Sequence, residues 1–550
     1  MKRFGSLAST LGGSGRHREA EDNQITEENK TIFQSFEWFL PGTTSDTLSH
    51  YTLLSSLLPH LSDLGITHIW LPPGCKATSV DDNGYSIYDL WDLGEFKARN
   101  YDRTARTKWG SSAELETFCS QARQYGVKVL WDTVLNHKAG ADEKEPSWGV
   151  KVDPNDRTKE LSQPYELETW TKFTFPGRGP KYSNMKYDWR HFSGVDYDAR
   201  RKEHGVFKLI GEGKRSDWAS DVSKELGNYD YLMFADLDHS HAAVRSDILN
   251  WSSWISSSLD LGGMRLDAIK HYSLSFVADL ISHLDSLAPR GKNMFFVGEY
   301  WDADSKVLEK VLNKFNGRLH LFDVQLVYTF SDLSKGRQWD LRTVFDGALT
   351  QLDPQHSVTF VANHDTQDTQ PLAAPVEEWF VPLGYALILL RRDTGTPCVF
   401  WGDIFGIHGP RARLPASGGK LARLLAARKQ YAYGPQRDYL DSADCIGWTR
   451  MGHNSKSHGT GLAVIMTNSW DRRSKRMFVG HRHTGEKWRD ILNWEDREVV
   501  IDSAGFGTFP VGHRSVGVWT DEKAPDFVKI SGLTFPRSGH AVPPVTNLPL

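Results

Sequence analysis

The chain has 550 residues, a length at which we expect more than one domain and a large buried core. Its formal net charge of −4 gives no electrostatic reason to expect nucleic acid or an anionic membrane surface as a partner. No run approaches the roughly 20 apolar residues of a membrane span, and the first residues lack the apolar core of a secretory signal. Four widely separated cysteines suit a reducing compartment, so we expect a cytoplasmic protein with no membrane partner.

Short strand-like runs alternate with amphipathic helical patterns over much of the chain. Helical patterns occur at 53–65, 113–126 and 275–288. Strand, helix, strand, repeated eight times, predicts an α/β fold in which parallel strands close into a (β/α)8 TIM barrel. The predicted barrel strands are 31–36, 67–72, 127–132, 263–268, 295–300, 319–324, 358–363 and 398–403.

Two regions do not follow this alternation. The interval between Asp132 and Met264 is too long for one helix and is rich in Gly, Asp, Trp and Tyr, which predicts a domain inserted after the third strand. After the helical pattern at 420–434, short alternating strands predict a separate antiparallel β-sandwich. The expected divisions are a disordered tail (1–29), the barrel (30–135 and 230–430), the inserted domain (136–229), the β-domain (431–520) and an extension (521–550).

Acidic residues stand at the ends of several predicted barrel strands. Asp132 ends the third strand, Asp267 the fourth and Glu299 the fifth, while Asp365 follows the seventh. Barrel closure brings these strand ends to one pocket, where converging carboxylates suit general acid/base and nucleophilic chemistry. Any one of these acids alone would more often be a cap or a solvated surface group, but four at matching strand ends favour a functional site.

Arg265 stands two residues before Asp267, so both side chains point to the same side of the predicted strand. One interpretation is a satisfied buried ion pair. The other is that Asp267 must stay ionised at a reacting centre and that Arg265 lowers its pKa. His137 and His364 adjoin the same strand ends.

A second group of acids lies in the predicted insertion, within the segment GNYDYLMFADLDH. Asp230, Asp236 and Asp238 fall within nine residues. Carboxylates spaced so closely either repel one another across a solvated loop or surround a hard cation that prefers oxygen ligands.

Four segments together carry a family resemblance. DTVLNH (132–137), GMRLDAIKH (263–271), VGEYW (297–301) and FVANHD (360–365) resemble, in order, the signature segments of the α-amylase family of glycoside hydrolases. Further segments, among them GYSIYDLWDLGEF, TFPGRG and ARKQYAYG, are similar to the liquefying subgroup and its intracellular fungal members. The resemblance covers about residues 30–520.

The resemblance implies roles for individual residues. Asp267 would be the nucleophile, Glu299 the acid and then the base, and Asp365 the residue that holds sugar hydroxyls while the ring distorts. Glu299 should then sit in a less polar environment or near other anions, so that it stays protonated near neutral pH. The substrate contacts implied are Tyr88, His137, Arg265, Lys270, His271, Trp301 and His364.

The resemblance also implies calcium as a cofactor. The ligands would be Asn136, Asp230, Asp236 and the main-chain carbonyl of His271, with Asp196, Asp217 and Asp238 near a second metal site. Ser240 stands where the subgroup often has a further acid, and Ala362 where relatives often carry an acidic residue, so the second site and the subsites differ from the family pattern.

The predicted function is endo-acting, retaining hydrolysis of α-1,4-glucosidic bonds in maltooligosaccharides, starch or glycogen-like glucans, by a monomer. Two alternatives stay open on sequence alone. A 4-α-glucanotransferase would use the same residues and differ only in whether a sugar or water intercepts the intermediate. A non-catalytic carbohydrate-binding relative would keep the barrel, although such proteins usually lose the acids that are present here.

Overall fold

A computed structural model describes residues 29–42, 48–98, 104–211, 217–288, 293–453 and 459–534. Its centre is a closed barrel of eight parallel strands, which confirms the predicted fold class. Each of the eight predicted strand runs overlaps one barrel strand. Around the barrel the order is β1 (Ile32–Gln34), β16 (Thr396–Phe400), β15 (Ser357–Phe360), β14 (His320–Phe322), β13 (Phe295–Gly298), β12 (Gly263–Leu266), β5 (Lys128–Thr133) and β2 (His68–Trp70).

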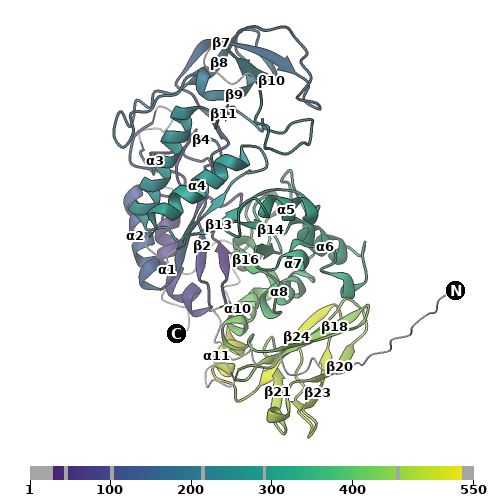
Figure 1. Cartoon of the computed structure of the whole chain (residues 1–550). Coiled ribbons are helices and arrows are strands. Elements are labelled where there is room, and N and C mark those ends of the chain that lie inside the picture. Colours follow the sequence, from purple (N-terminus) through teal and green to yellow (C-terminus); the bar gives the residue numbers. More distant parts are fainter. Residues whose placement is uncertain are drawn as a thin grey trace, which may run out of the picture.

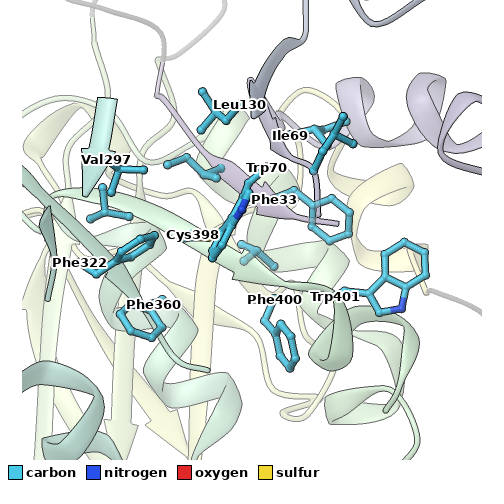
Figure 2. Close-up of a cluster of buried hydrophobic side chains, with 14 of the residues drawn as sticks. Phe33, Ile69, Trp70, Leu130, Val297, Phe322, Phe360, Cys398, Phe400 and Trp401 are labelled. Atoms are coloured by element: carbon cyan, nitrogen blue, oxygen red, sulfur yellow. The ribbon is translucent and has the colours of Figure 1, made fainter. Parts of the chain in front are cut away.

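Large apolar side chains fill the barrel and its surroundings (Figure 2). Phe33, Trp70 and Phe360 are each at most 1% exposed, and Trp70 packs against Phe322 with 5.5 Å between ring centroids. The strands are therefore buried on both faces, which is why their sequences read as continuous apolar runs rather than as an alternation.

Helices cover the outside of the barrel (Figure 1). The helix α2 shows how the sequence sets a helix start, because Ser111 and Glu114 form a reciprocal capping box at its first turn. The described α-helices are α1 (His50–Asp63), α2 (Ser112–Gln124), α3 (Ala242–Leu259), α4 (Leu274–Leu287), α5 (Ser305–Leu312), α6 (Val324–Ser334), α7 (Leu349–Leu352), α8 (Val381–Leu390), α9 (Trp401–Phe405), α10 (Leu421–Gln430) and α11 (Phe527–Gly532). None of these described helices is long and apolar enough to cross a membrane.

A six-stranded antiparallel sheet follows the third barrel strand and stands at one end of the molecule (Figure 1). Its order is β6 (His137–Lys138), β11 (Ala235–Leu237), β9 (Phe192–Asp198), β10 (Glu203–Ile210), β7 (Glu143–Val152) and β8 (Tyr165–Lys172). Because β11 belongs to this sheet, the sheet includes residues on both sides of position 229, where the inserted domain was expected to end. A small antiparallel pair, β3 (Lys76–Ala77) and β4 (Ile87–Asp89), leads toward it.

The C-terminal sheets lie at the other end of the barrel (Figure 1). Side chains from both sheets share one apolar cluster, including Met477, Phe509 and Trp519, so the two sheets face each other as in a sandwich. The larger sheet has the order β17 (Gln436–Ser442), β18 (Cys445–Arg450), β19 (Leu462–Thr467), β24 (Ser515–Asp521), β21 (Lys487–Asp490) and β22 (Val499–Val500), and the smaller pairs β20 (Arg473–Phe478) with β23 (Phe506–Val511).

The expected terminal segments are only partly described. Residues 1–28 and 535–550 lie outside the described residues. Within the expected extension, however, residues 521–534 pack against the rest of the chain. Ile530 is 2% exposed, and the carbonyl of Pro525 accepts a hydrogen bond from Tyr431 of the α10 region. The described part of this segment therefore belongs to the packed structure, because Ala524 and Ile530 are buried.

Candidate active site

One buried arginine connects three carboxyl groups at the carboxyl ends of the barrel strands. Arg265, on β12, is 1% exposed. Its Nη1 lies 2.8 Å from Asp132 Oδ1 and 2.5 Å from Asp267 Oδ1, and its Nη2 lies 2.7 Å from Glu299 Oε2. Parallel pairing places Arg265 beside Asp132 of β5, so barrel register brings these groups together. Such a shared guanidinium holds the carboxylates at defined positions.

The residue after Asp267 also positions an acid. Ala268 has a φ of +50°, in the left-handed region that residues with a side chain rarely adopt. In this conformation its backbone N–H donates to Glu299 Oε2 at 3.0 Å. Backbone strain of this kind persists only where the surrounding structure holds it, and it is found preferentially at functional sites.

Asp365 lies with a group of stacked rings at the same end of the barrel. His364 Nε2 is 3.2 Å from Asp365 Oδ2, and Gln34 Nε2 is 2.9 Å from His364 Nδ1. The Tyr85 ring is parallel to the His364 ring, with 5.2 Å between centroids. The Trp38 ring is nearly parallel to both, with its centroid 6.0 Å from that of Tyr85 and 6.1 Å from that of His364. This arrangement fixes the orientation of the aromatic wall beside Asp365.

Burial dominates the electrostatics of the carboxylate cluster. Burial raises the pKa of Asp267, and the positive charge of Arg265 opposes this shift while the charge of Glu299 adds to it. Arg265 thus lowers the pKa of Asp267 as expected, but burial outweighs it and the net shift is upward. Burial and then the charge of Glu299 raise the pKa of Asp365 to about 7. Burial is the main cause, and one guanidinium shared among several carboxyl groups does not offset it.

Both histidines of the site favour the neutral form. Burial lowers the pKa of His137 to about 4, and burial together with Arg265 lowers the pKa of His364 well below its ordinary value. His137 Nε2 lies 2.8 Å from the carbonyl of Tyr85. Neutral imidazoles at these positions can exchange hydrogen bonds with hydroxyl groups without adding positive charge.

Tyr85, rather than Tyr88, contacts the carboxylate cluster. The Tyr85 hydroxyl donates to Asp132 Oδ2 at 2.8 Å. The Tyr88 hydroxyl donates instead to Asp142 Oδ1 at 2.7 Å, and its ring packs on Phe175. Tyr88 lies on β4, where Ile87 and Asp89 point to the opposite face, so the strand directs Tyr88 toward the inserted segment.

Sequence reasoning did not single out Tyr85, Trp70 or Gln34 as site residues. Trp70 Nε1 donates to Asp132 Oδ2 at 3.0 Å. Trp70 and Gln34 are the last residues of β2 and β1, so the rule that selected the acids at strand ends could have found them as well. Tyr85 lies in a loop, and nothing in its spacing distinguishes it from Tyr88.

Three of the expected substrate contacts, Lys270, His271 and Trp301, follow the strand ends that carry Asp267 and Glu299. Lys270 Nζ donates to the carbonyl of Trp301 at 2.8 Å. Trp301 Nε1 donates to the Tyr328 hydroxyl at 2.9 Å. His271 Nδ1 lies 3.1 Å from the carbonyl of Tyr229, and burial lowers the pKa of His271 to about 3.

The expected calcium ligands form a buried, oxygen-rich group. Asn136 Nδ2 donates to Asp236 Oδ1 at 3.0 Å, while Asn136 Oδ1 is buried without a hydrogen-bond partner. Burial and the charge of Asp230 raise the pKa of Asp236 well above its ordinary value. An unpartnered amide oxygen beside two mutually repelling carboxylates fits a hard cation. Among the described residues no group of three or more His, Cys, Asp or Glu side chains suits a metal, so amide and main-chain oxygens would have to complete the set.

Of the three acids expected near a second metal site, two line one cavity and the third lies elsewhere. Asp217 and Asp238 line, with Asp230, a cavity of about 400 Å³ between the inserted sheet and the barrel. Asp238 Oδ1 already accepts from the backbone N–H of Ser240 at 2.9 Å. Asp196 lies instead at Phe234, whose backbone N–H donates to Asp196 Oδ2 at 3.2 Å.

Comparison with known proteins agrees with this geometry. A family model for the catalytic domain of α-amylases matches residues 52–509. The chain belongs to the α-amylase family. This α-amylase family member is 44% identical over 496 residues to a glucan 1,4-alpha-maltohexaosidase from a Bacillus species, covering 90% of this chain and 93% of that protein. It is 37% identical over 505 residues to the cytoplasmic alpha-amylase of Escherichia coli, covering 90% of this chain and 99% of that protein.

Solved structures show the same fold at low sequence identity. An alpha-amylase from Geobacillus thermoleovorans, solved in complex with acarbose, superposes with a TM-score of 0.57 at 16% identity. The match covers 90% of this chain and 98% of that one. At this identity the likeness concerns the fold alone.

Proposed function

We propose that this protein is an endo-acting α-amylase that hydrolyses α-1,4-glucosidic bonds with retention of configuration. The observation that carries the proposal is the single Arg265 guanidinium in contact with both Asp267 and Glu299. Two carboxyl groups held by adjacent nitrogens of one guanidinium are close enough to flank one glycosidic bond. Named relatives that hydrolyse glucans, at 44% and 37% identity over most of the chain, support the same reaction.

In the proposed mechanism Asp267 attacks the anomeric carbon while the bond from that carbon to the glycosidic oxygen breaks. Glu299, in its protonated form, donates its proton to the leaving oxygen. Glu299 then accepts a proton from water, which attacks the same carbon and releases Asp267. Asp365, His137 and His364 bind hydroxyls of the distorted sugar, while Lys270, His271 and Trp301 contact the leaving chain. Tyr85, not Tyr88, supplies the aromatic wall.

Replacing Glu299 with Gln tests this assignment. Loss of the proton donor should lower kcat on maltoheptaose by about 10²–10⁴-fold with little change in the melting temperature. The matched control is Glu309→Gln on the exposed surface of α5, which should leave kcat unchanged. Near-normal kcat in the Glu299→Gln variant would refute the role. Products longer than maltoheptaose would instead identify the glucanotransferase, and a β-anomeric first product would exclude retention.

We also propose that calcium binds where the inserted sheet meets the barrel. Asn136, Asp230, Asp236 and the carbonyl of His271 would hold the ion, and the unpartnered Asn136 Oδ1 supports this. Calcium there would join the inserted segment to the barrel and take no part in bond cleavage. Asp217 and Asp238 would serve any second cation at the adjoining cavity.

We further propose that the protein works inside the cell as a monomer, on soluble maltooligosaccharides or glycogen-like chains. All four cysteines are free and buried, which suits a reducing compartment. One relative, from Escherichia coli, is named a cytoplasmic alpha-amylase. The similarity to intracellular fungal members stays a prediction, since the relatives compared above are bacterial. Activity found mainly in the medium of intact cells would contradict this location.

A further inference from the structure

Three tryptophans and one arginine gather where loops of the barrel meet the C-terminal sheets. We call this group, Trp339, Trp379, Trp470 and Arg514, the Trp470 surface. Asn468 Nδ2 donates to the carbonyl of Trp339 at 2.7 Å, which ties the loop carrying Trp470 to the barrel. Trp379 Nε1 donates to the carbonyl of Ser334, at the end of α6, at 3.1 Å. The group therefore has a fixed framework although it lies on loops.

Two of these indole rings are unusually exposed. Trp470 is 68% exposed and Trp339 is 54% exposed. Eight of the other tryptophans are among the largest fully buried side chains of the protein. A large apolar ring left mostly in water gains little from burial, and exposed apolar surface of this kind commonly marks a binding site.

Arg514 is held in place by rings rather than by acids. Its guanidinium carbon lies 4.1 Å from the centroid of the Trp470 ring and 4.7 Å from that of Trp379. Its backbone N–H donates to the carbonyl of Ser469 at 2.9 Å. Within the described part of the chain, no side-chain hydrogen bond or ion pair uses the guanidinium, and its Nε is buried without a partner. Cation–π contacts thus orient a donor group that lacks an acceptor.

The ligand that matches this chemistry has flat apolar faces edged with hydroxyl groups. A glucose ring offers C–H faces to an indole and oxygen acceptors to a guanidinium, without requiring a compensating charge. Trp379 belongs to a loop whose residues Val376, Glu377 and Glu378 line a cavity of about 280 Å³. The same cavity includes Thr366 and Gln367, which directly follow Asp365. One loop therefore connects the Trp470 surface to the edge of the active site.

We propose that the Trp470 surface binds α-glucan chains outside the active site. Such a surface holds a polymer while another part of the same chain is cleaved, which raises the effective concentration of polymer at the active site. The inference rests on the proposed function, because it takes the polymeric substrate of that reaction as its ligand.

The test separates binding from cleavage. In the full chain carrying Glu299→Gln, the dissociation constant for glycogen is measured by affinity electrophoresis. Adding Trp470→Ala should raise this dissociation constant by about tenfold, a typical effect of removing a central aromatic contact. Arg514→Met keeps an apolar group between the rings and removes the donors, so it should raise the constant by a smaller factor. Tyr125→Ala, which removes another exposed ring, is the matched control.

A second readout uses the active enzyme. Trp470→Ala should lower the rate on glycogen relative to the rate on maltoheptaose. An unchanged dissociation constant in both Trp470→Ala and Arg514→Met, with circular dichroism showing folded protein, would overturn the proposal. A change of oligomeric state instead of glycogen affinity would also overturn it, because the surface would then bind a second copy. Failure of the proposed function is distinguishable, since it appears as absent maltoheptaose hydrolysis by the unmodified enzyme.

Discussion

At the scale of single residues, Asp365 gives the carboxylate cluster a pH signature. Its pKa rises from 3.8 to about 7 on folding, chiefly through burial. Between these values the native state holds a proton that the unfolded state has lost, so the free energy of unfolding falls as pH rises. The contribution is at most about 1.4 kcal/mol per pH unit.

Asp365→Asn removes this dependence while keeping the shape of the side chain. We expect the variant to become progressively more stable than the unmodified protein as pH rises from about 4 to about 7. Urea denaturation at several pH values measures the difference. Asp496→Asn, at an exposed position of the C-terminal domain, is the control and should show no such trend. A constant difference across this range would show that Asp365 does not hold its proton.

Tyr85 and Tyr88 form a natural pair for a second experiment. Tyr85→Phe removes the hydroxyl that donates to Asp132, and Tyr88→Phe removes the one that donates to Asp142. Losing a hydrogen bond to a buried charged group costs about 1.5–3 kcal/mol. We therefore expect Tyr85→Phe to lower kcat/KM on maltoheptaose by about tenfold or more and Tyr88→Phe to leave it nearly unchanged. The reverse order would restore Tyr88 as the substrate contact.

At the scale of elements, hydrophobic periodicity was sufficient to predict the barrel but not the residues that surround the catalytic acids. Each barrel strand is an apolar run between turn residues, and the acids follow those runs, so both were predictable. Tyr85 was not, because its position depends on the path of a loop. The rise in the pKa of Asp267 was also missed, since it depends first on burial and then on the other carboxyl groups around Arg265. The combined effect of burial and of charges from other strands cannot be predicted from the residues next to Asp267 in the sequence.

The start of α2 offers a test of local sequence control. The Ser111 hydroxyl accepts from the backbone N–H of Glu114, and Glu114 Oε2 accepts from the backbone N–H of Ser111 at 2.8 Å. Ser111→Ala should lower the free energy of unfolding by about 1 kcal/mol, because orphan N–H groups lose an acceptor. Ser112→Ala, one residue further into the helix, should change it by less than about 0.5 kcal/mol. Chemical denaturation compares the two, and equal losses would argue against capping.

At the scale of the whole molecule, calcium should stabilise the folded state. An ion that binds only folded protein adds about 2.7 kcal/mol when present at 100 times its dissociation constant. A chelator should therefore lower the melting temperature of the unmodified protein, measured by calorimetry. Asn136→Ala removes the unpartnered amide oxygen and should abolish most of that shift. A melting temperature insensitive to chelator, with no metal in elemental analysis, would reject the site.

The first and last strands of the inserted sheet in chain order, β6 and β11, pair with each other, since Lys138 opposes Ala235 and His137 opposes Asp236. The chain thus returns to the barrel next to the point where it left. The entropic cost of closing a loop grows only slowly with the length of the loop. The chain between β6 and β11 can therefore change in length, as long as Asp230 stays beside Asp236, without disturbing the pairing of β5 with β12 that sets Arg265 beside Asp132. Because of this junction, the insertion can change in sequence and length, and with it the glucan specificity, while the geometry of the reaction centre stays the same.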